Sequence, residues 1–282
     1  MTGLFTTRFA PSPTGLLHRG HAFSALTAFD AARAAGGRFV LRIEDIDATR
    51  SRPAFEAAIL EDLAWLGLAW ETPVRRQSEH LADYHRAIED LRARGLVYRC
   101  FRTRRELDIG RAPHAPTAPF VGASLPPEAE DLLLRRGQPF AWRLSLAAAR
   151  QALGGFQDLH FLEEGRGPEG QTGRITACPD RAGDIVLARK DVGVAYHLAV
   201  VLDDALQGVT HVIRGEDLFE AAHIQRLLQA LLGLPTPAYR HHRLLTGPDG
   251  KRYAKRDRPQ TLAELRAAGM TPRALRLEMG LT

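Results

Sequence analysis

The segment from Arg8 to His21 constrains the fold of this chain more than any other. It reads Arg8-Phe-Ala-Pro-Ser-Pro-Thr-Gly15, and His18-Arg-Gly-His21 follows two residues later. The proline, serine and glycine residues predict a tight turn, and the apolar spacing after them predicts a helix. The two histidines stand at i and i+3 in the first turn of that helix, so both rings can point at one phosphate group.

Strand patterns stand on both sides of this turn and helix. We predict a strand at 4–9, a helix with the apolar stripe Phe23, Leu26 and Phe29 that Gly36-Gly37 closes, and a second strand at 39–43. Together they form a βαβ unit, whose helix N-terminus offers N–H groups and the positive dipole end to an anion. This context favours a nucleotide-phosphate site over the alternative of a turn with satisfied imidazoles.

Further stretches carry a family resemblance. In chain order they are Arg42-Ile-Glu-Asp-Ile-Asp47, Ala195-Tyr-His-Leu-Ala-Val-Val-Leu-Asp-Asp204, Gly208-Val-Thr-His-Val-Ile-Arg-Gly-Glu-Asp217 and Lys251-Arg-Tyr-Ala-Lys-Arg256. With the first two motifs, they resemble class I glutamyl-tRNA synthetases over nearly the whole chain. The resemblance implies an α/β fold, namely a Rossmann-like doubly wound parallel sheet with an inserted acceptor-binding-like subdomain.

The length of the chain refines this resemblance. The chain ends at Thr282, shortly after Lys255, whereas a glutamyl-tRNA synthetase continues with a large helical anticodon-binding region. We therefore expect no anticodon-binding domain. The chain most resembles the truncated paralogues that load glutamate onto the queuosine base of tRNA(Asp), which implies ATP, L-glutamate and the anticodon loop of tRNA(Asp) as reactants and partner.

The resemblance also implies site residues. ATP activation of a carboxylate brings two anions together, so positive charge is needed around both. The residues implied for ATP are His18, Gly20, His21 and Lys255, of which His18, His21 and Lys255 are the catalytic candidates. The residues implied for glutamate are Arg8, Ala10, Ser12, Glu44, Tyr196 and Arg214. Glu44 is the natural partner of the α-ammonium, while the arginine that takes the side-chain carboxylate stays open. The basic segment has Arg252 in place of the usual first lysine.

Two metal sites are possible alternatives. Glu44, Asp45 and Asp47 could together hold Mg²⁺. We favour the ammonium role for Glu44 and expect Mg²⁺ to arrive with ATP. Related enzymes often carry a small zinc site near Cys100, but here Arg102 replaces the second cysteine, and Cys100 with His114 does not supply four ligands. We therefore expect neither zinc nor another resident metal.

Composition adds modest constraints. The 282 residues, 45% hydrophobic and 25% charged, can bury one or two cores without disulfides, and the two cysteines indicate a reducing compartment. No membrane span or leader is apparent, so we expect a cytoplasmic protein, acting as a monomer. The net charge of +5 favours a polyanionic partner only weakly. A more specific candidate for RNA contact is a short basic and aromatic stretch, which comprises Tyr98, Arg99, Phe101, Arg102, Arg104 and Arg105. A solvated arginine-rich helix start would explain this composition equally well.

The apolar pattern divides the chain into three parts. We expect the first half of the catalytic domain at 1–95, an inserted subdomain at 96–190, and the second half at 191–282 with the basic loop and short C-terminal helices. Further helices are predicted at 54–66, 80–94 and 218–232, and further strands at 184–188, 194–202 and 209–214. Turn-rich composition predicts loops at 110–127 and 165–173.

Two other functions compete with transfer to queuosine. The chain could be a catalytic region that charges tRNA(Glu) with an anticodon module supplied by another chain. It could also be a paralogue that has lost catalysis and binds RNA. The presence of His18, His21, Glu44, Arg214 and Lys255 favours an active enzyme over the second alternative.

Overall fold

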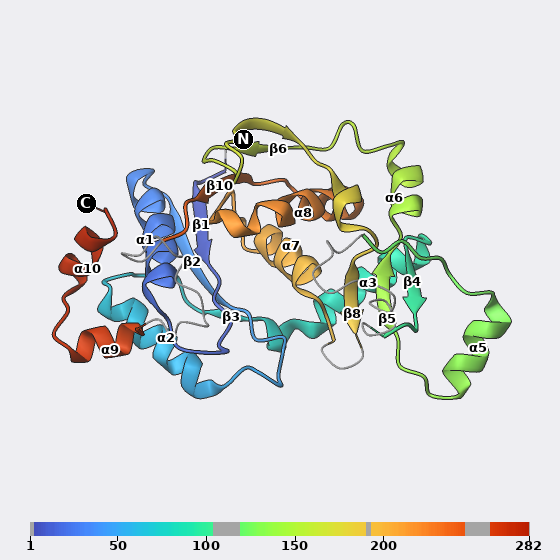
Figure 1. Ribbon diagram of the computed structural model, residues 1–282, viewed down its shortest axis with the longest axis horizontal. Coiled ribbons are helices and arrows are strands. Elements are labelled where there is room, and N and C mark those ends of the chain that lie inside the picture. The colour runs from blue at the N-terminus through green and yellow to red at the C-terminus, as the bar shows by residue number, and fades with distance from the viewer. Residues whose placement is uncertain (1–2, 104–118, 190–192, 246–259, 282) are drawn as a thin grey trace, which may run out of the picture.

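The computed structural model describes residues 3–103, 119–189, 193–245 and 260–281 (Figure 1). The strands are β1 (Thr6–Phe9), β2 (Arg38–Ile43), β3 (Arg75–Arg76), β4 (Val97–Cys100), β5 (Ala141–Leu144), β6 (His160–Glu163), β7 (Gly173–Thr176), β8 (Val186–Arg189), β9 (His211–Gly215) and β10 (Ala238–His242). The helices are α1 (Arg19–Ala34), α2 (Pro53–Trp65), α3 (Leu81–Ala93), α5 (Pro127–Arg135), α6 (Leu146–Leu153), α7 (Tyr196–Leu206), α8 (Phe219–Leu232), α9 (Leu262–Ala267) and α10 (Pro272–Glu278).

Parallel strands form the centre of the molecule. One group has the order β1-β2-β3, and another has the order β7-β6-β10-β9, in which only β7 is antiparallel to its neighbour. The two groups meet where the N–H of Thr210, just before β9, donates to the carbonyl of Thr6 at 3.0 Å. The late strand β9 therefore returns to β1, as the predicted doubly wound fold requires.

Helices cover both faces of this sheet because successive side chains of a strand point to opposite faces. On β1, Thr7 donates its hydroxyl proton to the carbonyl of Ala28 in α1, while Arg8 reaches Asp204 in α7. On β2, Leu41 joins the apolar core under α1 and α2, while Val40 joins the core that contains α3, α7 and α8. The sheet thus separates two cores, and Arg8 points into the α7 side.

Most elements predicted from the sequence are confirmed, but the strand predicted at 194–202 is wrong. The segment 194–202 contains most of the helix α7, in which the four consecutive apolar residues 198–201 are all buried. A short run of apolar residues that is buried on all sides shows no helical period, so the pattern alone could not distinguish the two structures. The strand predicted at 184–188 exists as β8, but it does not return to the central sheet.

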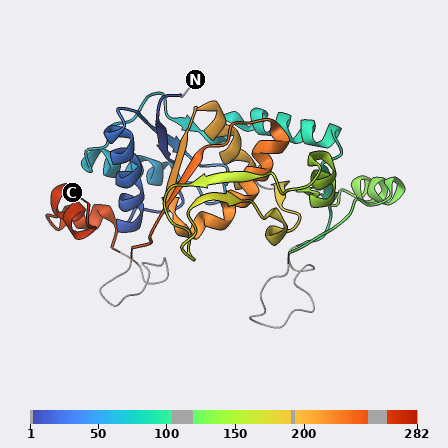
Figure 2. The same cartoon turned by 90° about the horizontal axis from the view of Figure 1, so that it is seen from above.

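The strands β4, β5 and β8 form a separate antiparallel sheet. With α5 and α6, it lies at the end of the molecule opposite α9 and α10 (Figures 1 and 2). This sheet lies within the predicted insertion at 96–190, but β6 and β7 of the same segment pair in the central sheet. The three-part domain division stays a prediction. Of the predicted loop at 110–127, residues 110–118 lie outside the described part, and 119–126 precede α5.

The two short C-terminal helices were expected and pack beside α1 and α2. Arg276 of α10 forms an ion pair with Asp30 of α1 at 2.5 Å. In α9, the Thr261 hydroxyl caps the helix by accepting the N–H of Glu264 at 3.2 Å. In the part of the chain that the structure covers, no helix combines the length and apolarity needed to cross a membrane.

A buried carboxylate lies between α2 and α9. The side chain of Asp62 is 1% exposed, and Arg266 approaches its Oδ1 only to 3.8 Å. Within the described residues, neither carboxylate oxygen accepts a hydrogen bond. Burial, only partly offset by Arg266, raises the pKa of Asp62 from 3.8 to about 6.

We predict that Asp62→Asn stabilises the protein at pH 8. Because the pKa of Asp62 is higher in the folded state, its ionisation destabilises the fold, progressively as pH rises from about 4 through about 6. The melting temperature of the variant should exceed that of the wild type by roughly 2–4 °C at pH 8, and the gain should vanish below pH 4. The control is Glu61→Gln, whose side chain is 66% exposed. A gain that does not change with pH would contradict the prediction.

Candidate active site

A cleft of about 1000 Å³ opens beside the ends of β1, β2 and β9. It brings together residues from segments far apart in the sequence. Those predicted for the site that line it are Arg8, Ala10, Ser12, His18, Gly20, His21, Glu44, Tyr196 and Arg214. Lys255, together with Arg252, lies outside the described residues. The predicted residues with a described position therefore share one cavity, while their roles stay predictions.

The two histidines cap the helix α1. His18 is the N-cap residue, and its Nδ1 accepts the N–H of Gly20 at 3.1 Å. The Nδ1 of His21 accepts the N–H of His18 at 3.2 Å. Since each Nδ1 is an acceptor, the proton of each neutral ring lies on Nε2. The ring centroids lie 3.8 Å apart, so both rings occupy one side of the helix start.

Gly20 has a steric role at this cap. A β-carbon at this position would lie 3.0 Å from Cε1 and 3.2 Å from Nδ1 of the His18 ring. Any side chain would therefore push against the ring whose nitrogen caps the helix. The glycine keeps the ring close to the first helical turn, on the side that faces the cleft.

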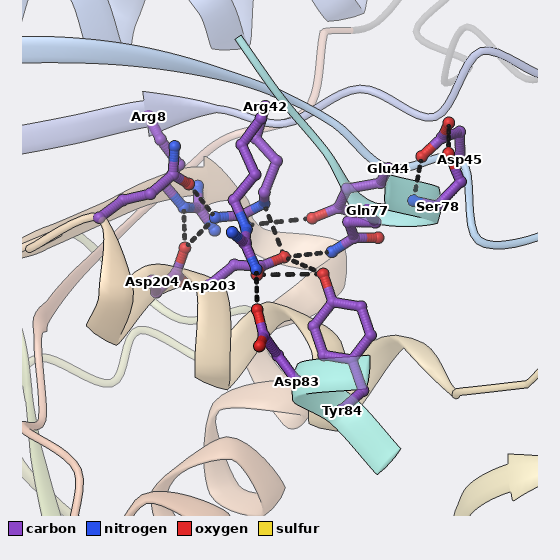
Figure 3. Close-up of polar contacts among 12 residues, drawn as sticks. Arg8, Arg42, Glu44, Asp45, Gln77, Ser78, Asp83, Tyr84, Asp203 and Asp204 are labelled. Carbon is purple, nitrogen blue, oxygen red and sulfur yellow. Dashed lines mark hydrogen bonds and ion pairs between the residues drawn. The ribbon is translucent and has the colours of Figure 1, made fainter. Parts of the chain in front are cut away.

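Arg42 is the centre of a buried ionic network under the cleft floor (Figure 3). Its Nη1 donates to Asp204 Oδ1 at 2.8 Å, its Nη2 donates to Glu44 Oε1 at 3.1 Å, and its Nε lies 3.7 Å from Asp203 Oδ2. The Arg42 side chain is fully buried. Asp204 also accepts from Nε of Arg8 at 3.3 Å. Arg42 thus holds both Glu44 and the carboxylate that positions Arg8.

The pKa values of Glu44 and Asp204, two acids of this network, are shifted in opposite directions. Burial raises the pKa of Glu44, because Arg42 and Arg8 offset the lost hydration only in part. Burial also opposes ionisation of Asp204, but Arg8 and Arg42 outweigh it and hold the pKa of Asp204 below its usual range. Asp204 is therefore the fixed anion. A further cation in the cleft would stabilise the ionised form of Glu44, and its expected role beside an ammonium group requires this form.

A second layer holds Asp203 from the other side. Its carboxylate accepts hydrogen bonds from Arg75 at 2.7 Å, from Gln77 at 2.8 Å and from the Tyr84 hydroxyl at 2.9 Å. Burial, with the adjacent Asp203 charge, raises the pKa of Tyr84, so its hydroxyl remains a donor. Arg42, Asp203 and Asp204 stood in the sequence motifs without an assigned role. An arginine inside a buried strand and two adjacent acids in an apolar run were the available signals.

The acids considered for a metal have separate protein partners. Asp45 accepts the N–H of Ser78 at 2.9 Å and its hydroxyl at 2.5 Å, and Asp47 accepts the hydroxyl of Thr49 at 2.6 Å. Glu44 points instead to Arg42. Over the described ranges, no group of three or more His, Cys, Asp or Glu side chains could hold a metal ion. Cys100 is buried on β4 and His114 lies outside those ranges.

Two residues of the aromatic and basic stretch at 98–105 make side-chain contacts within the protein. Tyr98 is buried and donates its hydroxyl to Asp184 at 2.8 Å. The guanidinium of Arg99 lies over the Trp142 ring, 4.7 Å from its centroid, and pairs with Glu130. These contacts favour a structural role for both residues. Arg102 is exposed, and Arg104 and Arg105 lie outside the described part.

Comparison with known proteins identifies the family. Residues 5–121 and 168–281 match the model of the catalytic domain of class I tRNA synthetases (E and Q). The chain belongs to this family. Its similarity to the glutamyl-Q tRNA(Asp) synthetase of Rhodobacter capsulatus is 49% identity over 98% of this chain and 99% of that protein. A glutamyl-Q tRNA(Asp) synthetase from Symbiobacterium thermophilum is 42% identical over 94% of this chain and 82% of that protein.

A solved structure gives the same fold for this class I synthetase. The glutamate-tRNA synthetase of Elizabethkingia anophelis superposes with a TM-score of 0.76 at 30% identity. The match covers 90% of this chain but 53% of the solved chain. This synthetase chain therefore spans about half the length of that structure, and the predicted class I catalytic fold is confirmed.

We predict that Arg42→Met lowers the free energy of unfolding severely. Removing the guanidinium leaves the buried carboxylates of Asp203, Asp204 and Glu44 without their shared partner, which should cost about 3–5 kcal/mol in urea unfolding. The control is Arg38→Met on the same strand, because the Arg38–Glu71 pair is exposed, and its loss should cost about 1 kcal/mol or less. Equal losses in both variants would show that the network does not support the fold.

Proposed function

We propose that this chain activates L-glutamate with ATP and transfers the glutamyl group to the queuosine base at the wobble position of tRNA(Asp). The observation that carries the proposal is the alignment with the Rhodobacter capsulatus glutamyl-Q tRNA(Asp) synthetase, which spans nearly the full length of both chains. The cleft supports it, because the residues expected for ATP and glutamate that have a described position line it together. We propose in addition that the enzyme is cytoplasmic and acts as a monomer.

The first step joins two anions. An oxygen of the glutamate α-carboxylate attacks the α-phosphorus of ATP, and pyrophosphate leaves with the bonding electrons. We assign to Nε2–H of His18 and His21 the stabilisation of negative charge on the phosphates, with Lys255 aiding the departure of pyrophosphate. Mg²⁺ bound to ATP would neutralise phosphate charge. Glu44 would pair with the ammonium group of the glutamate substrate, and the guanidinium groups of Arg8 and Arg214 would bind the carboxylates of the substrate.

The second step transfers the glutamyl group to RNA. A hydroxyl of the queuosine cyclopentene diol attacks the carbonyl carbon of glutamyl-adenylate, AMP leaves, and the hydroxyl proton is lost. The diol resembles the ribose hydroxyls at a tRNA 3′ end, so one catalytic fold suits either acceptor. A single-stranded anticodon loop can present its wobble base by splaying it outward.

Charging of tRNA(Glu) is a second candidate. A glutamate–tRNA ligase of Dinoroseobacter shibae is 41% identical over 96% of this chain, but the match covers 59% of that ligase. The higher identity of 49% to the Rhodobacter capsulatus glutamyl-Q tRNA(Asp) synthetase favours transfer to queuosine over this candidate.

We predict that the purified chain labels queuosine-containing tRNA(Asp) with radioactive glutamate in the presence of ATP. The label should be an ester on the base, so it should also form on tRNA(Asp) that lacks its CCA end. Queuosine-free tRNA(Asp) and tRNA(Glu) are the controls and should remain unlabelled. Labelling that requires an intact 3′ end would support the tRNA(Glu) candidate, and no glutamate activation with any tRNA would support an inactive paralogue.

We predict that His18→Asn separates the structural and catalytic roles of this histidine. The short amide can accept the N–H of Gly20 and preserve the helix cap, but it loses the ring Nε2–H. Glutamate-dependent pyrophosphate exchange should fall about 10²-fold, while the melting temperature changes little. The matched control is His18→Ala, which should lose both activity and the cap. Full exchange activity in the asparagine variant would remove His18 from the catalytic set.

A further inference from the structure

Three hydrogen bonds fix the guanidinium of Arg214 at the cleft wall. Its Nε donates to Nε2 of His241 at 3.0 Å, its Nη1 donates to Oε1 of Gln225 at 2.9 Å, and its Nη2 donates to the carbonyl of Leu218 at 2.9 Å. The residue is 4% exposed. Each terminal nitrogen of the group carries two protons and has one such bond, so its second N–H can donate to a ligand.

His241 connects Arg214 to a buried glutamate. It stands opposite Arg214 in the register of β9 and β10, so both side chains point to the same face. Its Nδ1 lies 2.5 Å from Oε2 of Glu163, and both side chains are fully buried. The other carboxylate oxygen of Glu163 accepts the N–H of His241 at 2.9 Å and that of Gly165 at 2.8 Å. Glu163 thus holds both the backbone and the ring of His241.

The direction of these bonds determines the proton position on His241. A guanidinium only donates, so Nε2 of His241 must be the acceptor, and the ring proton must lie on Nδ1. That proton is donated to Oε2 of Glu163. Burial lowers the pKa of His241, although the hydrogen bond to Glu163 opposes this effect, and the neutral ring is the form that Arg214 requires.

We infer that Glu163 and His241 are positioning residues that orient Arg214 toward a carboxylate of the glutamate substrate. The inference rests on the proposed function. Glu163 lies on β6, within residues 122–167, which the family model does not match. The chain just after β6 lies close against β10, because a β-carbon at Gly165 would collide with the backbone of His241. The chain segment outside the family pattern therefore supplies part of the support for a substrate-binding arginine.

The decisive variant is Glu163→Gln. Its amide oxygen can accept the two backbone N–H groups, which leaves the NH₂ group facing Nδ1 of His241. The ring proton must then move to Nε2, where it opposes Nε–H of Arg214. The KM for glutamate in pyrophosphate exchange should rise about 10-fold or more, while the KM for ATP stays within about 2-fold. Nitrogen-15 NMR of the imidazole should show His241 protonated on Nδ1 in the wild type and on Nε2 in the variant.

The matched control is Glu164→Gln, one residue further along the chain. Glu164 is exposed and pairs with Arg240 at 2.9 Å, away from Arg214, so this change should leave both KM values unchanged. His241→Gln keeps an acceptor for Arg214 and should retain more glutamate affinity than His241→Leu. This rescue would not occur if His241 only filled space.

Three results would overturn the inference. One is an unchanged glutamate KM in Glu163→Gln, and another is an equal rise in both KM values together with a lower melting temperature, which would indicate a purely structural role. The third is a wild-type ring protonated on Nε2. Failure of the proposed function is distinguishable, because the wild type itself would then show no glutamate-dependent exchange or would leave queuosine-containing tRNA(Asp) unlabelled.

Discussion

The ion pairs of the fully buried Arg42 guanidinium hold the two halves of the sheet together and keep the cleft residues in place. Arg42 lies on β2 in the first half of the chain and binds Asp203 and Asp204 on α7 in the second half. An isolated buried charge would be very costly, so the strand and the helix can adopt their positions only together. The same contacts orient Glu44 and, through Asp204, Arg8. Assembly of the core and alignment of the cleft residues are therefore one event.

The chemistry of the cleft follows from how its cations are held. Arg8 and Arg214 lie on neighbouring strands, and each guanidinium already has protein acceptors. A ligand meets only the N–H groups that remain, so its carboxylates must match fixed directions. Such preorganised donors bind a planar carboxylate with little loss of side-chain entropy. In the proposed function, selectivity for the amino acid would then depend on residues outside the cleft wall, which hold the arginines.

Sequence patterns could predict the outline of this site because the first βαβ unit is local. The turn, the histidine pair and the glycine stops identified β1, α1 and β2, and motifs in chain order led to Glu44, Tyr196 and Arg214. The contacts that hold these residues in place could not be predicted, because they join segments far apart in the sequence. Asp203 binds Arg75 and Tyr84, each more than 100 residues away, and Glu163 binds His241, which is 78 residues away. The helix α7 was mistaken for a strand because burial on all sides removed its period. The pattern contained the residue types, but pairing between distant segments depends on tertiary structure.

The path of the chain between its two sheets limits how the protein can change in evolution. After β4 and β5, the chain enters the central sheet as β6 and β7, then returns to the separate sheet as β8 before α7 begins. The peripheral sheet is thus not one continuous module. A single deletion that removed all of its strands would also remove β6, expose the edge of β10 and leave His241 without Glu163. Loss of that sheet would require two separate excisions with a new connection on each side of the β6–β7 hairpin, so gradual trimming is restricted to the loops and helices at its rim.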